Sequence, residues 1–117
     1  LGSKAIEVVV RTPDLTSGTD VPGVQDYGLT VSPNPFNPQT TVAFDLPAAG
    51  RAEIRIYSVR GELVAVLGGR HYEAGHHREI WAGRDRQGRD VPSGTYFARL
   101  YSDNEARGPV SRMSLVR

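Results

Sequence analysis

The sequence predicts an all-β fold, an Ig-like antiparallel β-sandwich of about seven strands, and two observations predict it. Short segments in which apolar and polar residues alternate recur along the chain, which is the period-two pattern of half-buried strands. Turn residues, among them 13 Gly and 8 Pro, separate these segments at short intervals, and no segment keeps a helical period.

Residues 1–25 differ from the rest of the chain. Segment 5–12 (AIEVVVRT) could form a strand, whereas segment 12–23 is rich in Pro, Gly, Ser, Thr and Asp, as linkers are. The first three residues, Leu1-Gly2-Ser3, are typical of a cloning remnant. We therefore expect a leader strand and linker over 1–25 and the β-sandwich over 26–117.

Seven segments of the chain are predicted strands. They are residues 28–33, 40–47, 51–58, 62–67, 76–83, 95–102 and 109–117. The segment 62–67 (ELVAVL) is apolar on both sides, which predicts either a central strand or a helical turn. Gly-bearing segments 59–62 and 85–90 are predicted hairpin turns.

The segment SPNPFNPQT (32–40) is the densest cluster of turn residues. Proline fixes φ and pushes the preceding residue into an extended conformation, and Asn side chains can close Asx-turns onto nearby backbone. We expect a structural corner that inserts Phe36 into the end of the sandwich; a recognition epitope is the alternative. The residues of this corner are Asn34, Pro35, Phe36, Asn37 and Pro38.

Alternation and aromatic character also predict the core. The expected core residues are Phe44, Ile54, Ile56, Trp81 and Tyr96. Segment 92–98 resembles the tyrosine corner of Ig sandwiches, in which a Tyr hydroxyl bonds to upstream backbone. An exposed Trp81 would instead suit a sugar, and three further aromatic residues could form a weak sugar-binding face: Tyr57, Phe97 and Tyr101.

No metal or cofactor is predicted. The histidines are His71, His76 and His77, and the last two are adjacent, so they project to opposite faces of a strand. The aspartates considered as calcium ligands are Asp85, Asp90 and Asp103. Calcium needs six to eight converging oxygens, and we expect Asp85 to close an Asx-turn instead.

Composition excludes several classes of function. The net charge of +1 gives no reason to expect a nucleic-acid partner, and the absence of Cys excludes disulfides and thiol chemistry. No apolar run approaches the roughly 18 residues of a membrane-spanning segment. No catalytic motif is recognisable, so we expect a protein that is not an enzyme.

The segment NPFNPQTTVAFDLP (34–47) resembles the opening of type A C-terminal sorting domains of the type IX secretion system, which are similar to the Ig-like domain of the flagellar hook-capping protein FlgD. Further segments that resemble this family are 54–67, 74–77, 81–88, 91–100 and 112–117. Three positions depart from its pattern: Ser58, Ala82 and Arg112. The resemblance therefore covers about residues 28–117.

The resemblance implies a sorting or attachment module on a secreted or cell-surface protein of a Gram-negative-type bacterium, with secretion machinery or neighbouring domains as partners. The expected sorting segment is Arg112, Met113, Ser114, Leu115, Val116 and Arg117, with Met113 and Leu115 inward, Arg112 and Ser114 available to a receptor, and the terminal strand at a sheet edge. One alternative is a structural subunit of an extracellular or flagellar-cap assembly that self-associates through edge strands. A carbohydrate-binding accessory module is the other.

Overall fold

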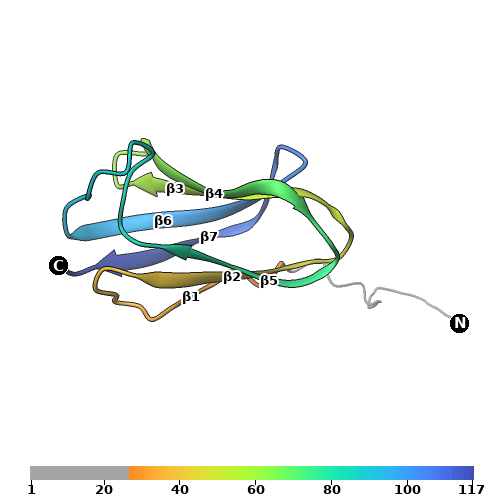
Figure 1. Cartoon of the computed structure of the whole chain (residues 1–117), viewed down its shortest axis with the longest axis horizontal. Coiled ribbons are helices and arrows are strands. Elements are labelled where there is room, and N and C mark those ends of the chain that lie inside the picture. Colours follow the sequence, from red (N-terminus) through yellow and green to blue (C-terminus); the bar gives the residue numbers. More distant parts are fainter. Residues whose placement is uncertain (1–26) are drawn as a thin grey trace, which may run out of the picture.

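The computed structural model describes residues 27–117 and confirms the all-β sandwich (Figure 1). Its strands are β1 (Thr30–Ser32), β2 (Thr40–Leu46), β3 (Gly50–Ser58), β4 (Leu63–Tyr72), β5 (Gly75–Trp81), β6 (Gly94–Ser102) and β7 (Glu105–Leu115). The predicted leader, residues 1–25, lies outside the described residues. Within the described part of the chain, no helix is long and apolar enough to cross a membrane.

Two antiparallel sheets form the two layers of the sandwich. The first has the strand order β1-β2-β5 and the second the order β4-β3-β6-β7. Strands β3 and β6 are central in the second sheet, and β6 carries the last strand, β7, on its outer side. The chain therefore changes sheet between β2 and β3, between β4 and β5, and between β5 and β6.

The core lies between the sheets and is built by the alternating residues of the strands. Strand β2 shows the pattern most plainly, because its residues are alternately buried and half-buried along its whole length. The most fully buried large side chains are Phe44, Ile54, Ile56, Leu100, Met113 and Leu115. All five predicted core residues lie in this cluster.

Strand β4 corrects the prediction for segment 62–67, which is neither a central strand nor a helical turn. It is the outer strand of the four-stranded sheet and extends to Tyr72. Ala65 points into the core, whereas Val66 is 38% exposed. The apolar residues on both sides arise because β4 lies under the β5–β6 connection, where the Arg86 backbone N–H donates to the Val64 carbonyl at 3.1 Å.

Strand β7 begins four residues before the predicted start. It follows a two-residue turn in which Asp103 and Asn104 have φ values of 53° and 67°. Two successive residues with positive φ give a turn whose twist matches a tight antiparallel hairpin. The Asp-Asn pair was the available signal for this turn.

Candidate functional site at the motif end

Parts of three segments with family resemblance, 34–47, 81–88 and 112–117, meet at one end of the sandwich, which we call the motif end. It consists of the corner 33–38, the β5–β6 connection 82–93 and the end of β7. In Figure 1 the C-terminus lies at this end, beside the β1–β2 and β5–β6 connections. Residues that are far apart in the sequence therefore share one small region.

The corner binds the outer edge of β7 through a ladder of hydrogen bonds. The Phe36 N–H donates to the Ser114 carbonyl at 2.9 Å, and the Val116 N–H donates to the Phe36 carbonyl at 2.8 Å. The Asn34 side chain extends this ladder: its Nδ2 donates to the Arg112 carbonyl, and the Ser114 N–H donates to its Oδ1, both at 3.0 Å. We call this arrangement the edge cap.

The edge cap corrects two predictions. We expected the Asn side chains to close local Asx-turns, but the Asn34 amide bonds to a strand about 80 residues away. A primary amide offers the same donor and acceptor as a peptide group, so it can pair with a strand edge. We also expected the terminal strand to present an open sheet edge, yet both backbone polar groups of Ser114 pair with the corner.

The sorting segment otherwise has the predicted inward and outward alternation. Met113 and Leu115 are 0% and 2% exposed, whereas Arg112 is exposed and Ser114 half-buried. Strand β6 pairs with this segment on one side and the edge cap on the other. Between Arg112 and Val116 the terminal strand therefore offers its outward side chains rather than its main chain.

Three aromatic rings fill the motif end beneath the corner. Phe36 is 2% exposed and packs on Trp81 with ring centroids 5.7 Å apart, and Trp81 meets Tyr96 edge-on at 5.3 Å. The Trp81 Nε1 donates to the Arg84 carbonyl at 2.9 Å. Trp81 is itself 2% exposed, so it offers no platform to a sugar.

Tyr96 makes the hydrogen bond of a tyrosine corner. Its hydroxyl donates to the Pro92 carbonyl at 2.7 Å, four residues upstream. Burial raises the pKa of Tyr96, and the nearby Arg117 guanidinium partly opposes that rise. This bond fixes the loop that leads into β6.

Arg117 holds the β5–β6 connection, which the sequence did not predict. Its Nε donates to the Val91 carbonyl at 2.6 Å and its Nη2 to the Gly83 carbonyl at 2.5 Å. Its backbone N–H donates to the Ser93 Oγ at 2.9 Å, and the Asp90 carboxylate lies 3.7 Å from its Nη2. The sequence could not predict these contacts, because the acceptors are backbone carbonyls of a loop and no side-chain pattern marks them.

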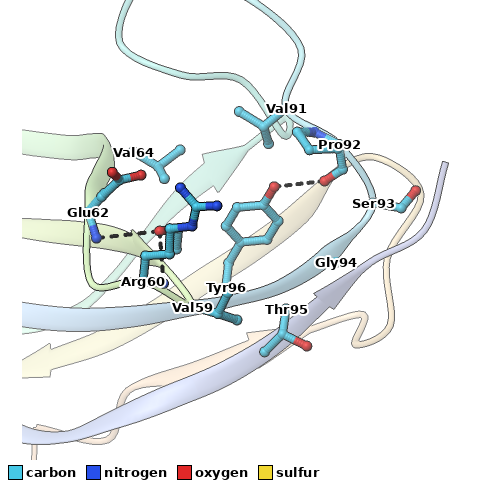
Figure 2. Close-up of a pocket in the computed structure, with 11 residues that line it drawn as sticks. Val59, Arg60, Glu62, Val64, Val91, Pro92, Ser93, Gly94, Thr95 and Tyr96 are labelled. Atoms are coloured by element: carbon cyan, nitrogen blue, oxygen red, sulfur yellow. Dashed lines mark hydrogen bonds between the residues drawn. The ribbon is translucent and has the colours of Figure 1, made fainter.

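An open pocket of about 350 Å³ lies beside Tyr96 at the motif end. Figure 2 shows apolar groups around it, including Val59, Val64 and Val91, with Arg60 and Glu62 nearby. The Ser58 Oγ accepts from the backbone N–H groups of Arg60 and Glu62 at 3.2 and 3.4 Å, as expected for the predicted 59–62 turn. No acid–base pair suited to catalysis is apparent among these lining residues.

The three histidines are separated. His77 faces inward onto the rings of Phe44 and Tyr72, His76 pairs with the Asp45 carboxylate, and His71 lies 3.6 Å from Glu73. Within residues 27–117 no three His, Asp or Glu side chains form a group that could hold a metal.

The three aspartates also lie apart. The Asp85 Oδ1 accepts from the N–H groups of Gln87 and Arg89 at 2.9 and 3.0 Å, which is the predicted Asx-turn. The backbone bond from Arg89 is the main cause that holds the pKa of Asp85 below its usual value; burial opposes it, and the bond from Gln87 adds to the lowering. Asp90 contacts Arg84 and Arg117, and Asp103 lies in the β6–β7 turn.

Comparison with known proteins supports the fold. No family model matches the chain, and no curated protein matches it. One similar solved structure is PorZ, an essential bacterial surface component of the type-IX secretion system of Porphyromonas gingivalis, with a TM-score of 0.52 and 21% identity over 77% of this chain. The chain spans 12% of the length of that PorZ chain.

A second similar structure is FlgD from P. aeruginosa. It has a TM-score of 0.56 and 17% identity, and the match covers 79% of this chain and 78% of that one. Likeness at these identities establishes a shared β-sandwich fold, in agreement with the fold that the sequence resemblance implied.

Proposed function

We propose that this chain is a non-catalytic sorting or attachment module that directs a secreted protein across the outer membrane to the cell surface through a type IX secretion system. The sequence resemblance over residues 28–117 and the fold shared with part of PorZ support this proposal. The structural observation that carries it is the edge cap, in which the opening and closing motifs of the resemblance form one hydrogen-bonded unit.

The edge cap gives the terminal segment a single conformation. Met113 and Leu115 are locked in the core, and Arg112 is presented outward in a fixed register with β6. A free peptide of the same sequence would not hold this arrangement, because short isolated strands are not stable in water. The sorting signal is therefore a property of the folded domain rather than of its last six residues alone.

The test is delivery of a reporter fused to the full 117-residue chain, in a host with type IX machinery. We expect the reporter at the cell surface, accessible to protease added outside the cells. The matched control is a fusion to the FlgD domain of P. aeruginosa, which shares the fold at 17% identity and should leave the reporter in the periplasm. Equal delivery by both domains, or none by this chain, would contradict the proposal.

Deleting residues 112–117 is a poor test of this function. The deletion removes two side chains that are 0% and 2% exposed, Met113 and Leu115, together with the partners of the edge cap. Loss of sorting would then follow from unfolding. Substitution of the outward residues is the sharper experiment.

A structural subunit of an extracellular assembly is the second candidate, and strand β5 favours it. This strand is the outer strand of the three-stranded sheet and carries Ile80, which is 57% exposed. Exposed apolar edge strands promote pairing between chains. Self-association in sedimentation experiments that Ile80→Lys abolishes would support assembly, and a monomer at high concentration would contradict it.

A further inference from the structure

The outer face of the four-stranded sheet carries arginine and aromatic side chains over three adjacent strands. Core residues such as Ile56, Ala98 and Met113 point inward, so the residues that alternate with them along each strand point outward. The outward residues that matter here are Arg55, Tyr57, Phe97, Arg99, Tyr101 and Arg112, which we call the arginine–aromatic face.

The strand register places Arg112 within this face. Phe97 pairs with Tyr57 of β3 on one side and with Arg112 of β7 on the other. Arg55 and Arg99 are partners in the next row. Side chains of directly paired residues are neighbours on the sheet surface, so Arg112 extends from the same surface as Phe97.

Part of the arginine–aromatic face is already fixed by contacts within the domain. The hydroxyls of Tyr57 and Tyr101 are hydrogen-bonded at 3.0 Å, and the Arg55 guanidinium lies 3.8 Å from the centroid of the Tyr101 ring. Arg55 also pairs with Glu53 at 2.5 Å. These contacts hold the side chains in place and cover the Tyr101 ring, which a sugar would need for stacking.

Among residues 27–117, two arginines on this face have no carboxylate partner. Within residues 27–117 the guanidinium of Arg112 makes no hydrogen bond or ion pair, and Arg99 makes one bond, from its Nε to the Gly108 carbonyl at 3.2 Å. By contrast, Arg55 on the same face is neutralised by Glu53. Arg99 and Arg112 thus leave uncompensated positive charge on β6 and β7, next to half-buried Phe97.

We propose that the arginine–aromatic face is the docking surface for an acidic segment of a partner protein, with Arg112 as its principal anchor. Carboxylates of the partner would bind Arg112 and Arg99 through paired hydrogen bonds, while an apolar side chain packs on Phe97. The edge cap favours this mode, because it occupies the main-chain groups by which a partner strand would pair with the end of β7. This inference rests on the proposed sorting function and specifies the chemistry of the partner that would recognise the domain.

The test is an NMR titration of the full chain, labelled with ¹⁵N, using the acetylated and amidated peptide EDEYED as probe. We expect chemical-shift changes on the amides of Tyr57, Phe97 and Arg112, and weaker binding at higher salt. Arg112→Gln should raise the Kd by about fivefold or more. The matched control, Arg78→Gln, removes an exposed arginine from the outer face of the other sheet and should leave the Kd unchanged.

Four outcomes would overturn the inference. The peptide fails to bind, its shifts map away from this face, or the two variants weaken binding equally. A fourth is that an oligogalacturonate binds through Arg112 whereas the peptide does not, which would assign the face to an acidic glycan. Arg112→Gln leaves the carbonyl bonded to Asn34 in place, so unchanged amide spectra elsewhere would exclude unfolding as the cause.

Reporter export separates this inference from the proposed function. If the wild-type chain delivers its reporter and Arg112→Gln delivers equally well, the docking inference fails and the sorting function stands. If the wild-type chain delivers nothing, the sorting function fails, whatever the titration shows. Loss of delivery in Arg112→Gln but not in Arg78→Gln would support both.

Discussion

The two ends of the sandwich are each filled by a cluster of three rings, but the clusters are closed in different ways. At the motif end, Phe36, Trp81 and Tyr96 lie beneath main-chain and amide hydrogen bonds from both ends of the described chain. At the opposite end, the rings of Phe44, Tyr72 and His77 pack against one another edge-on or tilted, with centroid distances of 4.8 to 5.6 Å. Polar side chains from the β4–β5 hairpin cover this second cluster.

The polar contacts that cover the second cluster are local. The Tyr72 hydroxyl donates to Glu79 at 2.5 Å, seven residues away, and the Arg70 guanidinium pairs with the same carboxylate and lies 4.6 Å from the centre of the Tyr72 ring. The Asn34 amide instead reaches 78 residues along the chain. The polar cover of one end thus forms within a hairpin, and that of the other depends on the β1–β2 corner meeting β7. Substitutions in the edge cap should therefore destabilise the terminal strand.

Phe36→Ala should have the largest effect. Truncating a fully buried Phe lowers the free energy of unfolding by about 3–5 kcal/mol, and Phe36 is 2% exposed against Trp81. Urea denaturation followed by Trp81 fluorescence measures the loss. An unchanged midpoint would show that Phe36 does not anchor the motif end.

Asn34→Ala should have an intermediate effect that is confined to the motif end. It removes two hydrogen bonds to β7, each worth about 0.5–1.5 kcal/mol. Hydrogen exchange should accelerate at the Ser114 amide and remain unchanged at Glu79. Asn37→Ala is the matched control, because Asn37 also precedes a proline and its side chain makes no hydrogen bond within residues 27–117. Equal effects of the two variants would show that the Asn34 amide has no special role in holding β7.

Tyr72 should make the opposite end sensitive to alkali, with the smallest effect of the three at neutral pH. Burial, reinforced by the hydrogen bond to Glu79, raises the pKa of Tyr72 well above its ordinary value of 10.0. The neutral phenol is therefore favoured in the folded state, and the stability that it contributes is complete below pH 10 and is lost as the pH rises further. Tyr72→Phe should flatten the fall in unfolding free energy between pH 9 and about pH 11, and an unchanged slope would contradict this assignment.

The sequence predicted the parts of the fold that rest on local patterns. Alternation, together with the turn residues between segments, located the strands of residues 27–117, because period-two burial is visible within a single segment, and it placed Phe44, Ile54 and Ile56 in the core. The position of β4 at a sheet edge was missed, since the loop residue that covers Val64 is Arg86, 22 residues further on. A segment that is apolar on both sides can be an edge strand covered by a loop or a central strand between two neighbours, and its residue pattern alone does not distinguish the two.

The candidate site was predictable only in part. Turn chemistry identified the corner around Phe36, and alternation gave the outward position of Arg112. The partners of Asn34 and Arg117 were not predictable, because they are backbone carbonyls and amides, which every residue carries and no side-chain pattern marks. The resemblance to sorting domains is supported at the level of the fold by the likeness to PorZ and FlgD.

Because of the edge cap, the corner can be closed only after β7 has been synthesised. Asn34 is synthesised 78 residues before Arg112, so until β7 has been made the corner lacks its partners and β6 is a bare sheet edge. A chain truncated before β7 would expose Phe36 and that edge together, and exposed apolar groups and bare sheet edges are features that chaperones and proteases recognise in damaged proteins. A chain in which β7 has formed conceals both, so the domain closes only once β7 is in place.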